Sequence, residues 1–234
     1  MTDISPIDRI FCAIDTPDLA DALLLAELLA GEVGAIKLGK EFFTTHGPDG
    51  VRKVAACGHK IFLDLKYHDI PNTVAKAVQS LSYLPIDMLT IHSSGGIEMM
   101  SAANRVRLDL KPDLLLLGVT VLTTMNEAQL RRVGVPTTPQ SQVHNLAGAT
   151  VESGIPGLVC SAKELDILTP DYGDSLQFVT PGIRPSGSSA DDQKRIVTPG
   201  QAAANGSNFI VVGRPIYQAD SPRAAVQAIN AELN

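Results

Sequence analysis

An aspartate and a lysine stand two positions apart at the end of an apolar run, Lys60-Ile61-Phe62-Leu63-Asp64-Leu65-Lys66. On a β-strand, residues i and i+2 point to the same face, so the carboxylate of Asp64 and the ammonium of Lys66 would project together. Burying opposite charges is costly unless they pair. The spacing therefore predicts a charged site rather than ordinary packing.

Polar residues recur at the ends of the neighbouring apolar runs. Asp69 follows three residues after Lys66. Pro71 stands two residues after Asp69, and proline suits the first turn of a helix but cannot continue a strand ladder. Further runs end in or contain other polar residues, namely Asp15, Lys37 and His92. One charge at a strand end is usually just solvated, but four consecutive strands with polar ends indicate a shared site.

Short β-like runs alternate with helix-like segments along the chain. The expected strands are Ile10–Asp15, Ala35–Gly39, Lys60–Lys66, Met88–His92, Leu114–Leu122, Gly157–Cys160, Gln177–Val179 and Asn208–Val212. The expected helices are Leu19–Leu29, Pro48–Cys57, Thr73–Ser82, Ile97–Leu108, Gln140–Ser153, Thr198–Ala204 and Pro222–Leu233. Strands that alternate with helices form right-handed βαβ units and a parallel sheet.

Eight such strands predict an α/β protein with a single (β/α)8 TIM barrel domain over residues 1–234. The length is slightly below the roughly 250 residues typical of this barrel. A doubly wound open sheet is the rival, but Ile14-Asp15-Thr16-Pro17 stands where its glycine-rich dinucleotide turn would follow the first strand. In a barrel, the polar strand ends would meet at the carboxyl-terminal rim, where catalytic groups lie.

The last part of the chain predicts a phosphate site. The final strand runs into Gly213-Arg214-Pro215, where glycine lets backbone N–H groups approach a ligand and the arginine fork suits phosphate. The loop after the seventh strand adds Pro181-Gly182-Ile183-Arg184 and, further on, Gln193. Barrel phosphate sites are commonly built from the loops after strands seven and eight. The Gly/Ser/Pro-rich piece Pro181–Asp192 is expected to be a mobile active-site loop.

Composition and charge argue against several classes of protein. With 44% hydrophobic and 19% charged residues the chain is an ordinary globular protein. A net charge of −6 and the lack of tryptophan predict neither nucleic-acid nor membrane binding. We find no signal peptide, and no apolar run approaches the roughly 20 residues of a membrane span. The three cysteines are too few for a disulfide framework, so we expect a soluble cytoplasmic protein.

Metal ligation is not indicated by the sequence. The five histidines show no paired ligand spacing, and the carboxylates near the third strand are accompanied by lysines, which oppose binding of a hard dication. We expect Lys37 and Lys66 to supply the positive charge that a metal supplies elsewhere.

Taken together, these motifs resemble bacterial orotidine 5′-monophosphate decarboxylases over essentially the whole chain. The most specific one is Asp64-Leu65-Lys66-Tyr67-His68-Asp69-Ile70-Pro71-Asn72-Thr73. Related sugar-phosphate barrels share a bare D-x-K-x-x-D pattern, so the resemblance depends on the whole ordered set. The other members are Lys37-Leu38-Gly39-Lys40-Glu41, Val119-Thr120-Val121-Leu122-Thr123, Thr180-Pro181-Gly182-Ile183-Arg184, Asp192-Gln193 and Gly213-Arg214-Pro215.

The resemblance implies a homodimeric barrel that converts orotidine monophosphate to UMP and CO2 in pyrimidine biosynthesis, with no cofactor or metal. Lys66 would give the proton to C6 of the pyrimidine. Asp64 would lie against the substrate carboxylate, and Lys37 would bridge the carboxylate network and the ribose.

The resemblance also implies the residues that bind the nucleotide. Asp69 and Thr73 would reach into the neighbouring subunit's site and bind the ribose there. Asp15 would be a second ribose contact and Thr123 a pyrimidine contact. The phosphate would be held by Gln193, Arg214, the backbone of Gly213 and Arg184.

Two alternatives stay open at this point. A related barrel that acts on a keto-sugar phosphate, such as a hexulose-phosphate synthase, would stabilise an enediolate with Mg²⁺ and would require the metal. The presence of Lys37, of Gln193 and of the segment Asp69–Thr73 argues against it. A catalytically silent nucleotide-binding barrel would bind UMP without decarboxylation.

Overall fold

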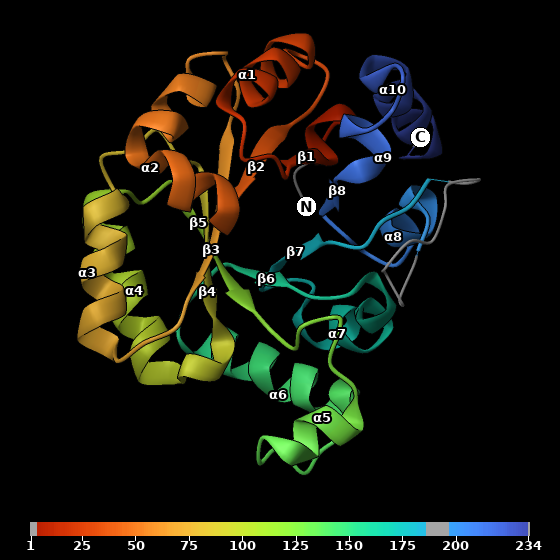
Figure 1. The fold of residues 1–234 in the computed structure, drawn as a ribbon. Helices are drawn as coiled ribbons and strands as arrows, with labels where there is room; N and C mark the ends of the chain where they lie inside the picture. The colour runs from red at the N-terminus through yellow and green to blue at the C-terminus, as the bar shows by residue number, and fades with distance from the viewer. Residues whose placement is uncertain (1–3, 186–196, 234) are drawn as a thin grey trace.

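The computed structural model describes residues 4–185 and 197–233, which form a closed barrel of parallel strands. The strands follow one another around the barrel in chain order, and β1 pairs with both β2 and β8, which closes the sheet. The helices lie outside this ring (Figure 1). The predicted (β/α)8 barrel is therefore confirmed, and the open doubly wound sheet is excluded.

All the expected strands are present, with ends that differ from the expected ones by at most three residues. They are β1 (Ile10–Ile14), β2 (Ala35–Gly39), β3 (Ile61–Tyr67), β4 (Met88–His92), β5 (Leu115–Val119), β6 (Gly157–Val159), β7 (Gln177–Thr180) and β8 (Phe209–Val212). The largest difference is in β5, which ends at Val119 and leaves the following residues to a loop.

The expected helices are also found, together with shorter ones. The α-helices are α1 (Leu19–Leu28), α2 (Lys40–Ala55), α3 (Pro71–Leu81), α4 (Ile97–Leu110), α5 (Glu127–Arg132), α6 (Pro139–Glu152), α7 (Leu165–Tyr172), α8 (Pro199–Ala204), α9 (Arg214–Tyr217) and α10 (Pro222–Leu233). Single 3-10 turns are η1 (Ile7–Arg9), η2 (Ser93–Gly95) and η3 (Ala162–Glu164).

The boundaries of several helices differ from the sequence prediction. The helix expected from Pro48 begins at Lys40 instead, and the two parts meet at a break at Gly47, where φ is 57°. Glycine adopts this conformation without the steric cost that a Cβ brings. Helices α5, α7 and α9 were not expected, because each is too short to show a clear amphipathic period.

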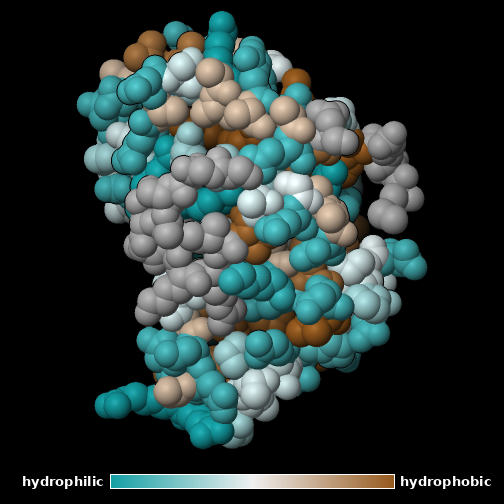
Figure 2. Space-filling model, turned by 90° about the vertical axis from the view of Figure 1, so that its right-hand side faces the viewer, coloured by the Kyte–Doolittle hydropathy of each residue, from teal (hydrophilic) through white to brown (hydrophobic). Residues whose placement is uncertain are grey.

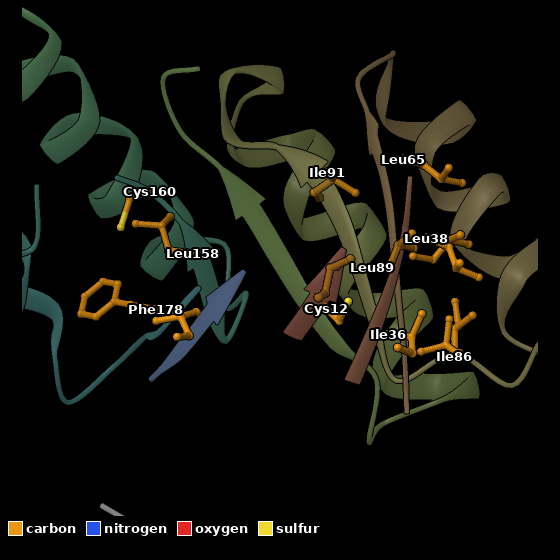
Figure 3. Packing of buried hydrophobic residues seen from close by; sticks show 14 of the residues in the cluster. Cys12, Ile36, Leu38, Leu65, Ile86, Leu89, Ile91, Leu158, Cys160 and Phe178 are labelled. Atoms are coloured by element: carbon orange, nitrogen blue, oxygen red, sulfur yellow. The ribbon is translucent and has the colours of Figure 1, made fainter. Parts of the chain in front are cut away.

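Alternate strand positions separate into two apolar layers. The outer layer lies between the sheet and the helices and includes Ile36 and Leu38 (Figure 3). The inner layer fills the barrel with Phe11, Ala13, Ala35, Phe62, Met88, Leu117, Val179 and Val211. A fully buried Leu, Ile or Phe contributes about 1.5–3 kcal/mol to folding. By the same alternation Lys37 and Asp64 face inward, so the interior is apolar below and charged at the carboxyl-terminal rim.

The face of the molecule on the side of α8 and α10 is mainly hydrophilic. Figure 2 shows hydrophobic residues there in small areas between hydrophilic ones. Such areas are ordinary on a protein surface. Among the helices that the structure describes, none is both long enough and apolar enough to cross a membrane.

Candidate active site

Asp64 lies between two lysines at the carboxyl-terminal rim of the barrel. Its Oδ2 is 2.6 Å from Lys66 Nζ and 3.8 Å from Lys37 Nζ. The register pairs Lys37 with Phe62, the inward residue two positions before Asp64, and the lysine side chain reaches up to the carboxylate. The side chain of Asp64 is only 13% exposed, so its charge needs these partners.

Asp15 extends the row of charges by one more member. Lys37 Nζ donates a hydrogen bond of 3.3 Å to Asp15 Oδ1, so the order Asp15, Lys37, Asp64, Lys66 alternates in sign. These four predicted site residues, which come from strands β2 and β3 and from the loop after β1, are brought together in one array. Within residues 4–185 and 197–233, no group of three or more His, Cys, Asp or Glu side chains is placed to hold a metal ion.

Strand β3 is irregular where it carries Lys66. Its pairing with β4 steps from Leu63 opposite Leu89 to Tyr67 opposite Ile91, so four steps on β3 match two on β4. Lys66 has a φ of 53°, the one positive value among the described non-glycine residues. This left-handed conformation costs about 1–2 kcal/mol for a residue with a Cβ. The predicted ion pair between Asp64 and Lys66 therefore forms, but it forms on an irregular backbone and not by the regular alternation of a strand.

Thr90 of β4 contacts both parts of this irregular segment. Its Oγ1 donates to Asp64 Oδ1 at 2.8 Å and accepts from the backbone N–H of Lys66 at 2.9 Å. Thr90 is completely buried. Sequence reasoning missed this residue, and its one signal was its place two positions before His92, on the same inward face of the strand.

The surroundings of Asp64 keep its carboxyl group ionised. Burial alone would raise its pKa, but the charges of Lys37 and Lys66 and the hydrogen bonds from Lys66 and Thr90 outweigh burial. The pKa of Asp64 is therefore below its ordinary value. The site holds a carboxylate, not a carboxylic acid, at neutral pH.

His92 lies beside the array but adds no charge to it at neutral pH. Its half-buried ring stands against the ring of His68, with centroids 5.5 Å apart. Burial, followed by His68, Lys40 and Lys66, lowers the pKa of His92 to about 4, against a smaller opposite effect of Asp64. The imidazole is consequently neutral when the lysines are charged.

Two arginines and a tyrosine gather where β8 ends. A Cβ built at Gly213 would lie 3.7 Å from both Asp15 Oδ2 and Tyr217 Cε1, so this glycine seats the end of β8 against Asp15. Burial, Asp15 and Glu41 raise the pKa of Tyr217, while the positive charges of Arg214 and Arg184 act in the opposite direction. The buried Arg184 Nε has no hydrogen-bond partner among the described residues. No sequence motif points to Tyr217 by itself.

Comparison with known proteins decides the family. The chain matches the model of the orotidine 5′-phosphate decarboxylase / HUMPS family over residues 8–229. It belongs to this family. The match covers every strand of the barrel and all the described residues of the charged array.

Members of the family are similar to this chain over nearly their whole length. An orotidine 5′-phosphate decarboxylase from Opitutus terrae is 50% identical over 220 residues, which cover 94% of this chain and 96% of that protein. One from Photobacterium profundum is 45% identical, with 96% and 98% covered. A crystal structure of orotidine 5′-phosphate decarboxylase from Lactobacillus acidophilus has a TM-score of 0.85, with 36% identity and 96% and 98% coverage.

Three of the other site residues predicted from the family resemblance, Asp69, Thr73 and Thr123, lie within the described residues. Asp69 is exposed, accepts a 2.7 Å hydrogen bond from the N–H of Ile70 and forms no ion pair with the described residues. Thr73 is exposed in the first turn of α3, and Thr123 is partly exposed in the loop after β5. Gln193 and most of the expected loop Pro181–Asp192 lie outside the described residues.

Proposed function

We propose that this chain decarboxylates orotidine 5′-monophosphate to UMP and CO2 in pyrimidine biosynthesis, with Lys66 as the proton donor and with no cofactor or metal. Family membership and the near full-length relatives named orotidine 5′-phosphate decarboxylase support the reaction. The observation that carries the residue roles is the position of Asp64, whose Oδ2 lies 2.6 Å from Lys66 Nζ and 3.8 Å from Lys37 Nζ.

The reaction requires the site to manage one electron pair. When the bond from C6 to the carboxylate breaks, CO2 leaves and the pair stays on C6, where the ring delocalises it poorly. The ammonium of Lys66 stabilises this charge and then gives its proton to C6, which leaves a neutral amine. Enzymes lower such barriers by about 8–23 kcal/mol in general. A positive charge already fixed at the rim needs no reorganisation at the moment of reaction.

Asp64 contributes through its charge and its position. Because its pKa is held low, it stays ionised beside the substrate carboxylate. Departure of CO2 would relieve the repulsion between the two carboxylates. Lys37 contacts Asp15 on one side and Asp64 on the other, so it is placed to bridge the ribose and the carboxylate end of the substrate.

The phosphate end of the nucleotide is assigned to the residues around the end of β8. Arg184 follows β7 and Arg214 follows β8, and the Nε of Arg184, which has no hydrogen-bond partner among the described residues, suits an anion's oxygen. Gln193 and the backbone of Gly213 complete this proposed set, while Thr123 would contact the pyrimidine. Binding energy from this remote end can be used to orient the ring at Lys66.

We include a homodimer in the proposal, in which Asp69 and Thr73 bind the ribose in the neighbouring subunit's site. The support is that both side chains are exposed and that Ile70, next to Asp69, is 66% exposed despite its apolar side chain. A partner would cover this isoleucine and give Asp69 a function. A cytoplasmic location is also proposed, in keeping with three free cysteines.

Loss of the orotidine monophosphate absorbance on adding purified protein tests the reaction. Turnover is expected with no added metal and in the presence of EDTA. A requirement for Mg²⁺ and activity on a keto-sugar phosphate would favour the hexulose-phosphate type of enzyme instead. Binding of UMP by calorimetry with no turnover would favour a silent nucleotide-binding barrel.

The variant Lys66→Ala tests the proton donor. It should lower kcat by about 10⁴-fold or more, because the proton source and the positive charge are both lost. The matched control is Lys60→Ala, which removes an exposed lysine just before β3 at the other end of the barrel and should keep normal turnover. Near-normal turnover in folded Lys66→Ala protein would disprove the assignment.

A further inference from the structure

We propose that Thr90 is a positioning residue, whose one hydroxyl group sets the carboxylate of Asp64 and the backbone of Lys66 in their working geometry. The proposal rests on the roles proposed above for Asp64 and Lys66. Its basis is the pair of hydrogen bonds that Thr90 Oγ1 makes, one to each of these residues.

The irregular register explains why a side chain is needed at this place. Between the pairs Leu63–Leu89 and Tyr67–Ile91, the backbone of β3 departs from the regular ladder with β4. A buried backbone N–H without a partner is costly, so the N–H of Lys66 needs another acceptor. Thr90 Oγ1 is that acceptor, at 2.9 Å. The hydroxyl therefore supports the left-handed conformation of Lys66 that aims its side chain at the site.

The same hydroxyl also fixes how Asp64 is turned. A threonine hydroxyl has one proton to donate and two lone pairs that accept. Since a lone pair takes the N–H of Lys66, the proton is free for Asp64 Oδ1 at 2.8 Å. With Oδ1 held there, Oδ2 faces the ammonium groups of Lys66 and Lys37, at 2.6 Å and 3.8 Å. Because Thr90 is completely buried, water does not compete for these bonds.

Thr90 acts through Asp64 and Lys66, and a loss of its hydroxyl should show in the chemical step. The variant Thr90→Val keeps the shape and removes both hydrogen bonds. We expect its kcat to fall about 10- to 100-fold, with UMP affinity changed only a few-fold. Thr90→Ser keeps the hydroxyl and should retain kcat within a few-fold.

The matched control is Thr150→Val, which removes the hydroxyl of another completely buried threonine. Thr150 in α6 bonds to Ser93 Oγ and to the carbonyl of Leu146, away from the charged array. Both Thr→Val changes remove a buried hydroxyl, so a general loss of stability would appear in both. A fall in kcat confined to Thr90→Val would support positioning. Equal kcat in these two variants, or a loss of kcat in Thr90→Ser as large as in Thr90→Val, would overturn it.

A second measurement does not depend on turnover. Titration of the Asp64 carboxyl carbon by NMR should give a higher pKa in Thr90→Val than in the parent protein or Thr90→Ser, because the hydrogen bond that favours the carboxylate is gone. The acid limb of the kcat/KM profile should move to higher pH in parallel. If the parent chain turned over no orotidine monophosphate, the proposed function would fail while the titration still reported the contact from Thr90. An unchanged pKa would overturn the positioning role itself.

Should Thr90→Val not fold, Thr90→Cys serves in its place, since a thiol of similar size is a weak donor and a weak acceptor. The kcat of Thr90→Cys is expected to be lower than that of Thr90→Ser but higher than about one hundredth of the parent value. A cysteine variant with the kcat and the Asp64 pKa of the parent protein would overturn the proposal.

Discussion

At the scale of single residues, the site consists of charges that are stable only as a set. Asp64 is nearly buried, and the removal of one partner from such a pair leaves an uncompensated charge that destabilises the fold. The alternation from Asp15 to Lys66 gives every charge an opposite neighbour. The same alternation places the ammonium of Lys66 beside a carboxylate, which is the arrangement that the proposed protonation of C6 needs.

The sequence predicted these residues because charges in apolar strands are conspicuous. Asp64 and Lys66 stand out by their spacing, and Lys37 and Asp15 by the apolar residues around them. Thr90 does not stand out, because a threonine in a strand is ordinary and its importance depends on a register shift that no local pattern shows. Tyr217 was missed for a similar reason, since its neighbours come from β1 and from the loop after β7.

His92 gives a prediction about stability and pH. Its pKa is about 4 in the folded protein, against an ordinary value of 6.5 in the unfolded chain. Between these pH values the unfolded chain binds more protons than the folded one, so the free energy of unfolding should decrease as pH falls through this window. If the unfolded chain bound one full proton more than the folded one, the free energy of unfolding would change by roughly 1.4 kcal/mol per pH unit. The observed slope should be smaller than this, because the ring of His92 is partly exposed to water.

The test compares His92→Gln with the parent protein by urea denaturation at several pH values between the two limits. The variant should lose less stability than the parent on acidification, whatever its stability at neutral pH. Parallel curves for the two proteins over this window would contradict the prediction.

At the scale of elements, order was easier to predict than boundaries. Apolar runs of β-branched and leucine residues identified every strand, since parallel strands in a barrel are buried on both faces. Helix α7 was missed because it is eight residues long and contains Pro170, which reads as a helix breaker. Helix α9 is a single turn whose proline lies at its start. Such short elements are set by packing against the barrel rather than by their own sequence period.

Gly34, just before β2, gives a prediction at this scale. A Cβ built there would lie 2.6 Å from the carbonyl carbon of Asp8 in η1, and the N–H of Gly34 donates to the carbonyl of Ile10 at 2.9 Å. Both contacts are with backbone, which cannot move aside as a side chain can. Gly34→Ala should therefore lower the free energy of unfolding by about 1–3 kcal/mol.

Gly39→Ala is the matched control in a denaturation experiment. Its Cβ would meet only the ends of two side chains, Lys37 Nζ at 3.5 Å and Asp15 Oδ1 at 3.6 Å, and its φ is −89°. This variant should stay within about 0.5 kcal/mol of the parent protein. An equal loss of stability in the two variants would show that the close approach of η1 is not what requires glycine at position 34.

At the scale of the whole molecule, closure of the barrel makes one site from distant parts of the chain. Pairing of β1 with β8 brings Asp15 beside Gly213, although most of the sequence separates them. Asp69 remains outside the array and finds no ionic partner among the described residues of its own chain. One subunit therefore supplies three of the four proposed catalytic residues to one place, and the fourth is free to serve another copy.

A mixture of two inactive variants tests whether subunits share their sites. Lys66→Ala and Asp69→Ala homodimers should both lack working sites. In a hybrid dimer with crossed contributions, one site would carry both changes and the other neither. Random exchange makes about half of the dimers hybrids, so about 25% of the parent activity should return.

The matched control mixes Lys66→Ala with Asp64→Asn. Each of these two changes affects the site of the subunit that carries it, so both sites of a hybrid dimer are damaged and no activity should return. If the first mixture stays inactive after native mass spectrometry has shown hybrid dimers, Asp69 does not serve the neighbouring site.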